Sequence, residues 1–357
     1  MEGLVGTSSW AGTNVLITGH TGFKGSWLAE WLLLAGANVS GLALQPDGSS
    51  DLFDALGLAD RLAGHHEVDV RDAAAVARVV AAARPQVIFH LAAQALVRRS
   101  YREPLATWQV NVDGTLNVLE AAKLAGGLTT VVAVTTDKVY KNREWEFAYR
   151  EEDELGGHDP YSASKAACEI AVASWRASFG SQDGVRVATA RAGNVVGPGD
   201  QSEDRIVPDC YRAWRLGESV QLRNPASTRP WQHVLEPLSG YVALAEHVRS
   251  GRSPIDACNF GPGSAGDRSV GELVGALGRL GTDRSWTMSN EVHPHEARAL
   301  ALAIDRAKLR LGWEPRLDFA ETMAWTDQGY SAAPGLLASV VREQIHAYVG
   351  RIETGRR

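Results

Sequence analysis

Tyr161 and Lys165 lie four residues apart in the segment Tyr161-Ser-Ala-Ser-Lys165, so a helix would carry both on one face. A phenol has a reference pKa of about 10 and is a weak base at neutral pH. A neighbouring ammonium group stabilises the phenolate and lowers that pKa. The pair could therefore perform acid–base chemistry on a hydroxyl group, although the same spacing also occurs by chance on many helices.

A second group of reactive side chains is the run Thr135-Thr136-Asp137-Lys138, which ends an apolar strand predicted at 130–135. The carboxyl ends of parallel strands are where doubly wound folds bind ligands. Thr136 could bind a substrate hydroxyl beside Tyr161, and Asp137 and Lys138 could act as an acid–base pair. The alternative for an isolated Asp-Lys is a surface ion pair. Its position at a strand end favours the catalytic interpretation, because ionisable groups of active sites are tuned in pairs.

These residues follow a glycine-rich segment, Gly19-His-Thr-Gly22-Phe-Lys-Gly25, between a predicted strand at 14–18 and a predicted helix at 24–35. Glycines in such a turn allow the backbone to approach a pyrophosphate closely. The first turn of the helix offers free N–H groups and a positive dipole end. The spacing is one residue longer than Gly-x-Gly-x-x-Gly. In this strand–turn–helix context it predicts dinucleotide binding.

The residues that would contact the adenosine half of the cofactor are less regular. An acidic residue after the second strand usually binds the ribose, and this chain has Gln45 there. Glutamine can bind a ribose hydroxyl but lacks the charge that repels a 2′-phosphate, and Lys24 lies nearby in sequence. We expect NAD rather than NADP. Asp69 is a candidate for the adenine side, with a solvated strand-end carboxylate as the equal alternative.

The elements that position these residues alternate strand and helix through residue 192, with strands predicted at 14–18, 38–44, 67–70, 87–92, 130–135 and 185–191. Helices are expected at 24–35, 73–83, 105–125 and from 161. This pattern predicts an α/β fold, a Rossmann-type doubly wound parallel sheet. After residue 193 strands become rare and short helices appear. We expect an NAD-binding domain at 1–192 and a smaller mixed α/β substrate lobe at 193–357, with the chain crossing between them more than once.

Composition excludes several other classes of protein. The 357 residues include 45% apolar and 22% charged side chains, which is ordinary globular usage. A net charge of −6 without a basic cluster argues against nucleic-acid binding. No apolar stretch is long enough to span a bilayer, and the first residues do not resemble a secretion signal. The three cysteines fit reduced thiols in a cytoplasmic protein, and the spacing of the histidines indicates no metal site.

Taken together, the motifs resemble the extended short-chain dehydrogenase/reductase superfamily. Within it they are most similar to the CDP-glucose 4,6-dehydratases, in which Asp-Lys follows the threonine where related dehydratases carry Asp-Glu. The segments that carry the resemblance are Gly19–Trp27, His90–Gln94, Asn111, Thr136–Tyr140, Lys141–Trp145, Gly156–Tyr161, Arg191–Asn194, Arg229–Pro237 and His293–Ala297. Two departures are Gln45 and the apolar segment 298–303.

The resemblance implies a set of site residues and an oligomeric state. The cofactor NAD would contact Gly19, Thr21, Gly22, Phe23, Lys24, Gly25, Gln45, Asp69, Val70, Leu91, Ala92, Ala93, Asn111, Tyr161 and Lys165. The nucleotide sugar, CDP-glucose, would contact Gln94, Asn194, Arg205, Arg229 and His295. The catalytic residues would be Thr136, Asp137, Lys138, Tyr161 and Lys165. A homodimer or homotetramer would be expected.

The implied reaction is a closed redox cycle. Tyr161 would take the C4 hydroxyl proton while hydride passes to NAD, Lys138 would remove the C5 proton, and Asp137 would protonate the departing C6 hydroxyl. Hydride would then return to C6. One alternative is a nucleotide-sugar epimerase, reductase or decarboxylase that uses the same Tyr161 and Lys165. Another is a dinucleotide sensor without catalysis, which would need only the glycine-rich segment.

Overall fold

A parallel sheet of seven strands in the order β11-β6-β5-β4-β1-β2-β3 forms the centre of the molecule. The computed structural model describes residues 8–46, 48, 50–180, 184–263, 267–288 and 300–355. The strands of the sheet are β1 (Asn14–Thr18), β2 (Asn38–Ala43), β3 (Gly64–Glu67), β4 (Val87–His90), β5 (Thr129–Val134), β6 (Val185–Ala192) and β11 (Ala257–Phe260). This order confirms the predicted Rossmann-type fold.

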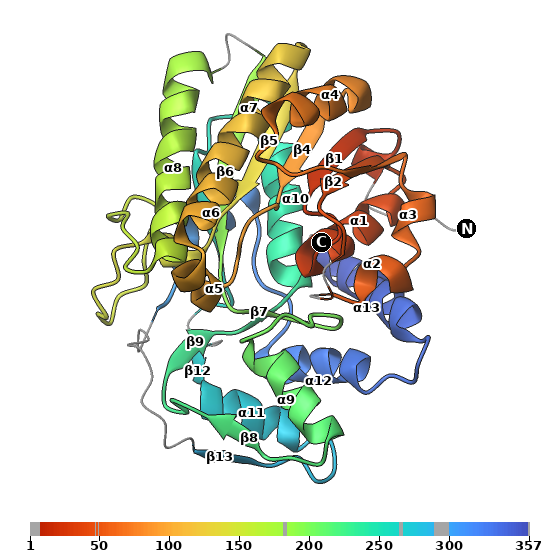
Figure 1. Ribbon diagram of the computed structural model, residues 1–357, viewed down its shortest axis with the longest axis vertical. Coiled ribbons are helices and arrows are strands. Elements are labelled where there is room, and N and C mark those ends of the chain that lie inside the picture. Colours follow the sequence, from red (N-terminus) through yellow and green to blue (C-terminus); the bar gives the residue numbers. More distant parts are fainter. Residues whose placement is uncertain are drawn as a thin grey trace.

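Helices cover both faces of the sheet, because successive side chains of each strand point to opposite faces. Ile17 of β1 packs in the core beneath α1, α10 and α13, whereas the adjacent Leu16 packs in the core beneath α4, α7 and α8. The helices are α1 (Phe23–Leu34), α10 (Leu235–Arg249) and α13 (Leu337–Thr354) on the first face, and α4 (Ala73–Ala83), α7 (Gly114–Ala125) and α8 (Pro160–Phe179) on the second. Figure 1 shows α4, α7 and α8 lying along their side of the sheet.

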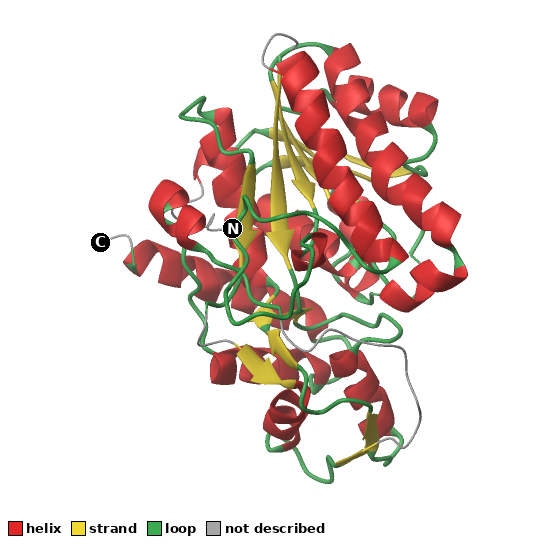
Figure 2. Ribbon diagram, turned by 90° about the vertical axis from the view of Figure 1, so that its left-hand side faces the viewer, coloured by secondary structure: helices red, strands yellow, loops and turns green. Residues whose placement is uncertain are grey.

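A smaller lobe lies beyond the carboxyl ends of the strands, at the bottom of Figure 1, and the strand arrows of Figure 2 point toward it. It has its own core, which includes Tyr211, Leu273 and Met323. Its elements are α9 (Ile206–Arg215), α11 (Val270–Gly278), α12 (Phe319–Tyr330), the pair β8 (Val220–Leu222) and β13 (Trp286–Met288), and the pair β9 (Thr228–Pro230) and β12 (Asp267–Ser269).

The chain after residue 192 contributes to both parts of the molecule. Strand β11 pairs with β6 in the central sheet, and α10 and α13 pack on its face. The division of the chain at residue 192 into two domains stays a prediction. None of the helices in the described ranges is long and apolar enough to cross a membrane.

The remaining elements are short, and one of them, together with strand β3, differs from the sequence-based expectation. They are η1 (Ser8–Trp10), α2 (Leu52–Ala55), α3 (Leu58–Arg61), α5 (Val97–Arg102), α6 (Pro104–Trp108), η2 (Gln109–Asp113), η3 (Asp137–Val139), β7 (Val195–Val196), β10 (Gln232–His233) and η6 (Ala307–Leu311). A π-helical turn, η2, interrupts the helix expected at 105–125. The strand expected at 67–70 instead ends at Glu67, because Asp69 accepts a hydrogen bond from the Arg71 N–H and turns the chain.

Candidate active site

The glycine-rich segment forms a tight loop between β1 and α1. Gly19 has a φ of +75°, and a side chain there would come within 2.8 Å of the Ala92 nitrogen. A side chain at Gly25 would lie 2.1 Å from the Gly19 carbonyl oxygen. Gly22 is the N-cap residue of α1, and no described side chain caps that helix end. The first N–H groups of the helix are therefore available to an anion, and this donor set fits the diphosphate of a dinucleotide.

The end of β4 lies directly beside this loop. The Leu91 N–H donates to the Thr18 carbonyl oxygen at 3.1 Å, and the Ala92 N–H donates to Thr18 Oγ1 at 3.1 Å. Thr18 Oγ1 also lies 2.7 Å from Nδ1 of His90, which is buried. Burial lowers the pKa of His90 to about 3, with the charge of Lys165 as a smaller cause. A neutral His90 therefore joins β4 to β1. The segment 91–93, which is predicted to contact the cofactor, follows directly and lies beside the glycine loop.

Asn111, for which the sequence predicts a contact with the cofactor, is buried and hydrogen-bonded to other residues of the chain. Its amide donates to Ser164 Oγ at 2.8 Å and to the Gln94 carbonyl oxygen at 3.1 Å, while its Oδ1 accepts from the Gln94 N–H at 2.9 Å. The Gln94 side-chain amide donates in turn to Thr107 Oγ1 and to the Leu96 carbonyl oxygen. Asn111 thus ties the loop after β4 to α8, and Gln94 ties it to α6. A direct contact with cofactor or substrate stays a prediction for each.

The adenosine end of the predicted cofactor site lies at the ends of β2 and β3. Asp69 forms hydrogen bonds of 2.5 to 3.0 Å with Arg71, which lower the pKa of its carboxyl group. Val70 is buried, and its side chain lies 2.7 Å from the position that a side chain at Gly114 would take. Gln45 donates from Nε2 to Glu67 Oε2 at 2.7 Å. Sequence reasoning missed Glu67, since no motif distinguishes a single acidic residue near a strand end.

The strand end after β5 brings Thr136 and Asp137 together. Thr136 Oγ1 donates to Asp137 Oδ1 at 2.9 Å, and Asn194 Nδ2 donates to Asp137 Oδ2 at 3.1 Å. Only a glycine fits at position 193, because a side chain there would come within 2.0 Å of the Asp137 carboxyl group. Asn194 adopts a φ of +51°, a conformation that asparagine tolerates better than most residues. Asn194 therefore contacts Asp137, and the contact with substrate that the sequence predicts for Asn194 stays a prediction.

Tyr161 and Lys165 occupy the first turns of α8. Asp159 caps this helix by accepting a hydrogen bond from the Ser162 N–H at 2.9 Å. Burial raises the pKa of Tyr161 to about 12, although a hydrogen bond with Thr136 acts in the opposite direction. Lys165 donates from Nζ to the Val134 carbonyl oxygen at 3.0 Å, and burial lowers its pKa. The structure thus brings Tyr161 beside Thr136 and ties Lys165 to the end of β5. The pKa of Tyr161 is thus raised by burial, whereas the sequence predicts that Lys165 lowers it.

Charged side chains from three elements converge on this centre. Burial lowers the pKa of Lys24 to about 7, and the charges of Arg205 and Lys165 lower it further, whereas Asp137 and Asp200 raise it. Arg205 Nη1 lies 3.0 Å from Asp200 Oδ2, and its charge lowers the pKa of Tyr161. Lys24 and Arg205 are therefore close to the Asp137 and Tyr161 centre. Lys138 follows Asp137 in η3 and is half-buried.

The other two residues predicted for substrate binding lie in the second half of the chain. Arg229 is buried in β9 and donates from Nη1 to the Thr228 carbonyl oxygen at 2.7 Å. His295 lies outside the described residues, as do Arg298 and Ala299 of the apolar segment. A role for Arg229 and His295 in binding the diphosphate or the sugar stays a prediction.

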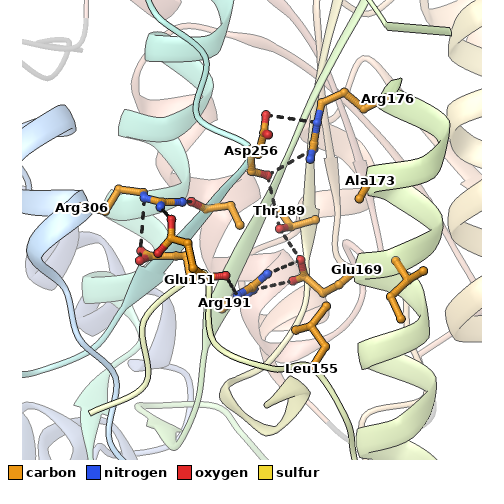
Figure 3. A pocket seen from close by; sticks show the side chains of 12 residues that line it. Glu151, Leu155, Glu169, Ala173, Arg176, Thr189, Arg191, Asp256 and Arg306 are labelled. Atoms are coloured by element: carbon orange, nitrogen blue, oxygen red, sulfur yellow. Dashed lines mark hydrogen bonds and ion pairs between the residues drawn. The ribbon is translucent and has the colours of Figure 1, made fainter. Parts of the chain in front are cut away.

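A cavity of about 350 Å³ lies between α8, β6 and the segment around Glu151 (Figure 3). Figure 3 shows Arg191 facing Glu169 and Arg176 facing Asp256 across it. Neither Tyr161 nor Lys165 lines this cavity, so it is separate from the reaction centre. Its charged side chains pair with one another, which indicates a structural network, and sequence reasoning assigned no role to Glu169.

The parallel sheet, the glycine loop and the cluster of Thr136, Tyr161 and Lys165 define an extended short-chain dehydrogenase/reductase. A family model described as GDP-mannose 4,6 dehydratase matches residues 16–326. The chain belongs to this family, which confirms both the predicted superfamily and the predicted enzyme class, a nucleotide-sugar 4,6-dehydratase.

Three known proteins illustrate the relationship. A CDP-glucose 4,6-dehydratase of Salmonella typhimurium is 43% identical over 327 residues, which cover 90% of this chain and 91% of the relative. A dTDP-glucose 4,6-dehydratase of Streptomyces griseus is 32% identical, with 89% of this chain and 94% of the relative covered. The crystal structure of a UDP-glucose 4-epimerase of Thermus thermophilus in complex with NAD superimposes with a TM-score of 0.76 at 25% identity, covering 89% of this chain and 99% of the epimerase.

Proposed function

We propose that this enzyme uses NAD to convert CDP-glucose into CDP-4-keto-6-deoxyglucose, with water lost across C5 and C6. The observation that carries the proposal is the position of Thr136 between two acid–base groups. Its hydroxyl donates to Asp137 at 2.9 Å and forms a hydrogen bond with Tyr161. Oxidation at C4 requires one acid–base group, and elimination across C5 and C6 requires a further pair. The proposal assigns the first role to Tyr161 and the second to Asp137 and Lys138.

The residues on the cofactor side support NAD binding. The uncapped start of α1 would hold the diphosphate, and the segments at 91–93 and 69–70 lie along the same edge of the sheet. The Thermus thermophilus epimerase, which shares this fold, is complexed with NAD. When bound, NAD would accept hydride from C4 and give it back at C6, so that it is not consumed.

The side chains of this chain would move the protons. Tyr161 would take the proton of the C4 hydroxyl, and the nearby positive charge of Arg205 would favour its phenolate. Lys138 would remove the C5 proton, which a ketone at C4 makes acidic. Asp137, held by Thr136 and Asn194, would protonate the C6 hydroxyl as it leaves. Over the elimination Lys138 would gain the proton of C5 and Asp137 would lose one to the departing water, and C5 would take up a proton again when hydride returns to C6.

The choice of CDP rests on the relative of Salmonella typhimurium, whose identity of 43% exceeds the 32% of the dTDP-glucose relative. Arg205 and Arg229 would contact the diphosphate, because guanidinium groups bind phosphate oxygens in a bidentate manner.

The direct test is incubation of the purified enzyme with CDP-, dTDP-, UDP- or GDP-glucose and a small amount of NAD. The ultraviolet absorbance of a 4-keto-6-deoxy sugar in alkali reports the product. We expect product from CDP-glucose at the highest rate. A faster reaction with another nucleotide sugar would contradict the assignment of CDP-glucose as the substrate. Conversion to a C4 epimer without formation of the ketone would favour the epimerase alternative.

We further propose that the enzyme works as a homodimer or homotetramer in the cytoplasm. Large apolar side chains are exposed on α5, α6 and α8, including Tyr101, Leu105 and Ile170, and these could pack against a second copy. The three cysteines are buried free thiols, which suits a reducing compartment. Light scattering coupled to gel filtration would measure the oligomeric state, and a monomer at micromolar concentration would contradict the proposal.

A further inference from the structure

The end of β2 lacks the carboxylate that commonly binds the adenosine ribose in a dinucleotide-binding fold. The strand ends at Ala43, and Leu44 and Gln45 follow it. A carboxylate at this position serves two purposes, because it accepts hydrogen bonds from the ribose hydroxyls and repels a 2′-phosphate. If this enzyme prefers NAD, the negative charge must come from another element.

Such a charge is present on the neighbouring strand. Glu67 is the last residue of β3, and its Cα is the register partner of Ala43. In parallel strands, register partners point to the same face of the sheet, so the Glu67 side chain extends from beside Ala43, two residues before Gln45. Half of this side chain remains exposed to solvent. Its carboxylate is therefore accessible to a ligand.

The carboxylate of Glu67 is also held in place. Gln45 Nε2 donates to Glu67 Oε2 at 2.7 Å, and His65 Nε2 lies 4.0 Å from Oε1. The glutamine that replaces the usual acid thus draws a carboxylate of the next strand toward the end of β2. Each carboxylate oxygen has two lone pairs, so the hydrogen bond from Gln45 leaves acceptor capacity for ribose hydroxyls.

The position of this pair matches the path of a dinucleotide. Thr21 of the glycine loop donates from Oγ1 to the Leu44 carbonyl oxygen at 3.1 Å, which ties the phosphate-binding loop to the end of β2. On the other side, Asp69 and Val70 follow Glu67 within three residues. A dinucleotide that extends from the start of α1 to the segment 69–70 would place its adenosine ribose near Gln45 and Glu67.

We propose that Glu67 makes the enzyme bind NAD in preference to NADP, and that Gln45 positions its carboxylate. Glu67 on β3 would thus take the role of the acid that usually follows β2. The inference rests on the proposed use of NAD. Glu67 would accept hydrogen bonds from the adenosine ribose, and a 2′-phosphate would meet its negative charge at close range.

The test measures cofactor binding rather than turnover. The dissociation constants of NAD and NADP are determined by calorimetry at pH 8 for the wild type, Glu67→Gln, Gln45→Ala and the control Glu120→Gln. Glu120 is an exposed glutamate of α7, ion-paired with Lys123. We expect the preference of Glu67→Gln for NAD over NADP to fall at least about tenfold, and that of Glu120→Gln to match the wild type. Gln45→Ala should show an intermediate loss, because the carboxylate remains but is no longer held.

A second variant, Glu67→Lys, replaces the repelling charge with an attracting one and should bind NADP more tightly than NAD. Unchanged selectivity in both Glu67 variants, with melting temperatures like that of the wild type, would overturn the role of Glu67 while leaving NAD as the cofactor. A wild type that itself prefers NADP, or that binds neither dinucleotide, would instead overturn the proposed cofactor and the inference with it.

Discussion

Glu169 of α8 and Arg191 of β6 form a bidentate ion pair that is almost fully buried, with contacts of 3.0 Å from Nε and 2.8 Å from Nη2. Glu169 also accepts hydrogen bonds from the hydroxyls of Thr135 and Thr189. Thr135 is adjacent to the catalytic candidate Thr136, and Glu169 lies one helical turn beyond Lys165. The network therefore fixes the helix that carries Tyr161 and Lys165 against the strand end that carries Thr136 and Asp137.

This arrangement predicts a large loss of stability when one partner is removed. Arg191→Met should lower the free energy of unfolding by about 3–5 kcal/mol, because it leaves Glu169 buried and uncompensated. The double variant Glu169→Met/Arg191→Met should lose less than Arg191→Met alone. Urea unfolding measures both. Arg176→Met is the control, because its partner Asp256 is largely exposed and the pair should contribute no more than about 1 kcal/mol. Additive losses in the double variant would contradict a coupled pair.

Tyr161 is expected to act as the base at C4. Tyr161→Phe keeps the ring but removes the hydroxyl, so it should still bind NAD and nucleotide sugar while turnover falls about 10²–10⁴-fold. Steady-state kinetics measures turnover, and calorimetry measures the binding of NAD and of the nucleotide sugar. Tyr101→Phe, which changes an exposed ring of α5, should behave like the wild type. A rate for Tyr161→Phe close to that of the wild type would remove the phenol from the mechanism.

Asp137 and Lys138 are assigned to the steps after C4 oxidation. Lys138→Ala or Asp137→Asn should therefore accumulate enzyme-bound NADH when substrate is added, visible as absorbance at about 340 nm, because elimination is blocked and hydride cannot return. The control Lys141→Ala removes an exposed lysine that pairs with Glu154 and should not accumulate NADH.

The same assignment predicts an isotope result. Wild-type product formed in heavy water should carry deuterium at C5, because the proton lost there is replaced from solvent. Dehydration by Lys138→Ala at the normal rate would show that Asp137 and Lys138 are structural, and the epimerase or reductase alternative would then fit better.

Glu236 on α10 predicts a pH dependence of stability. Burial raises the pKa of its carboxyl group from 4.5 to about 7, although hydrogen bonds from Tyr348 and from the N–H groups of Arg316 and Leu317 act in the opposite direction. The folded state therefore binds the proton more tightly than the unfolded chain. The resulting stabilisation is complete below pH 4.5 and is lost as the pH rises toward and beyond 7, by about 1–3 kcal/mol.

The measurement is the free energy of unfolding between pH 5 and pH 8 for the wild type, Glu236→Gln and the exposed control Glu343→Gln. Between these limits the wild type and the control should lose about 1–3 kcal/mol relative to Glu236→Gln, which has no proton to release. Parallel curves for all three proteins would show that Glu236 does not titrate in this range.

The sequence by itself determined the features that depend on neighbours along the chain. The glycine loop, the pair Tyr161 and Lys165 at one helical turn, and the alternation of strand and helix follow from local spacing and hydrophobic periodicity. These were sufficient to predict the parallel sheet and the superfamily. Local patterns also misplaced the strand expected at 67–70, because the Asp69 and Arg71 turn ends it early.

Only the tertiary structure decided which distant side chains meet. Glu67 reaches Gln45 because β2 and β3 pair in one particular register, and Asn194 reaches Asp137 because Gly193 leaves room for the carboxylate. The Glu169 and Arg191 pair depends on how α8 packs against β6. Such contacts join residues that are 22 or more positions apart and carry no local periodicity, so strand register and packing, rather than the spacing of residue types, set them.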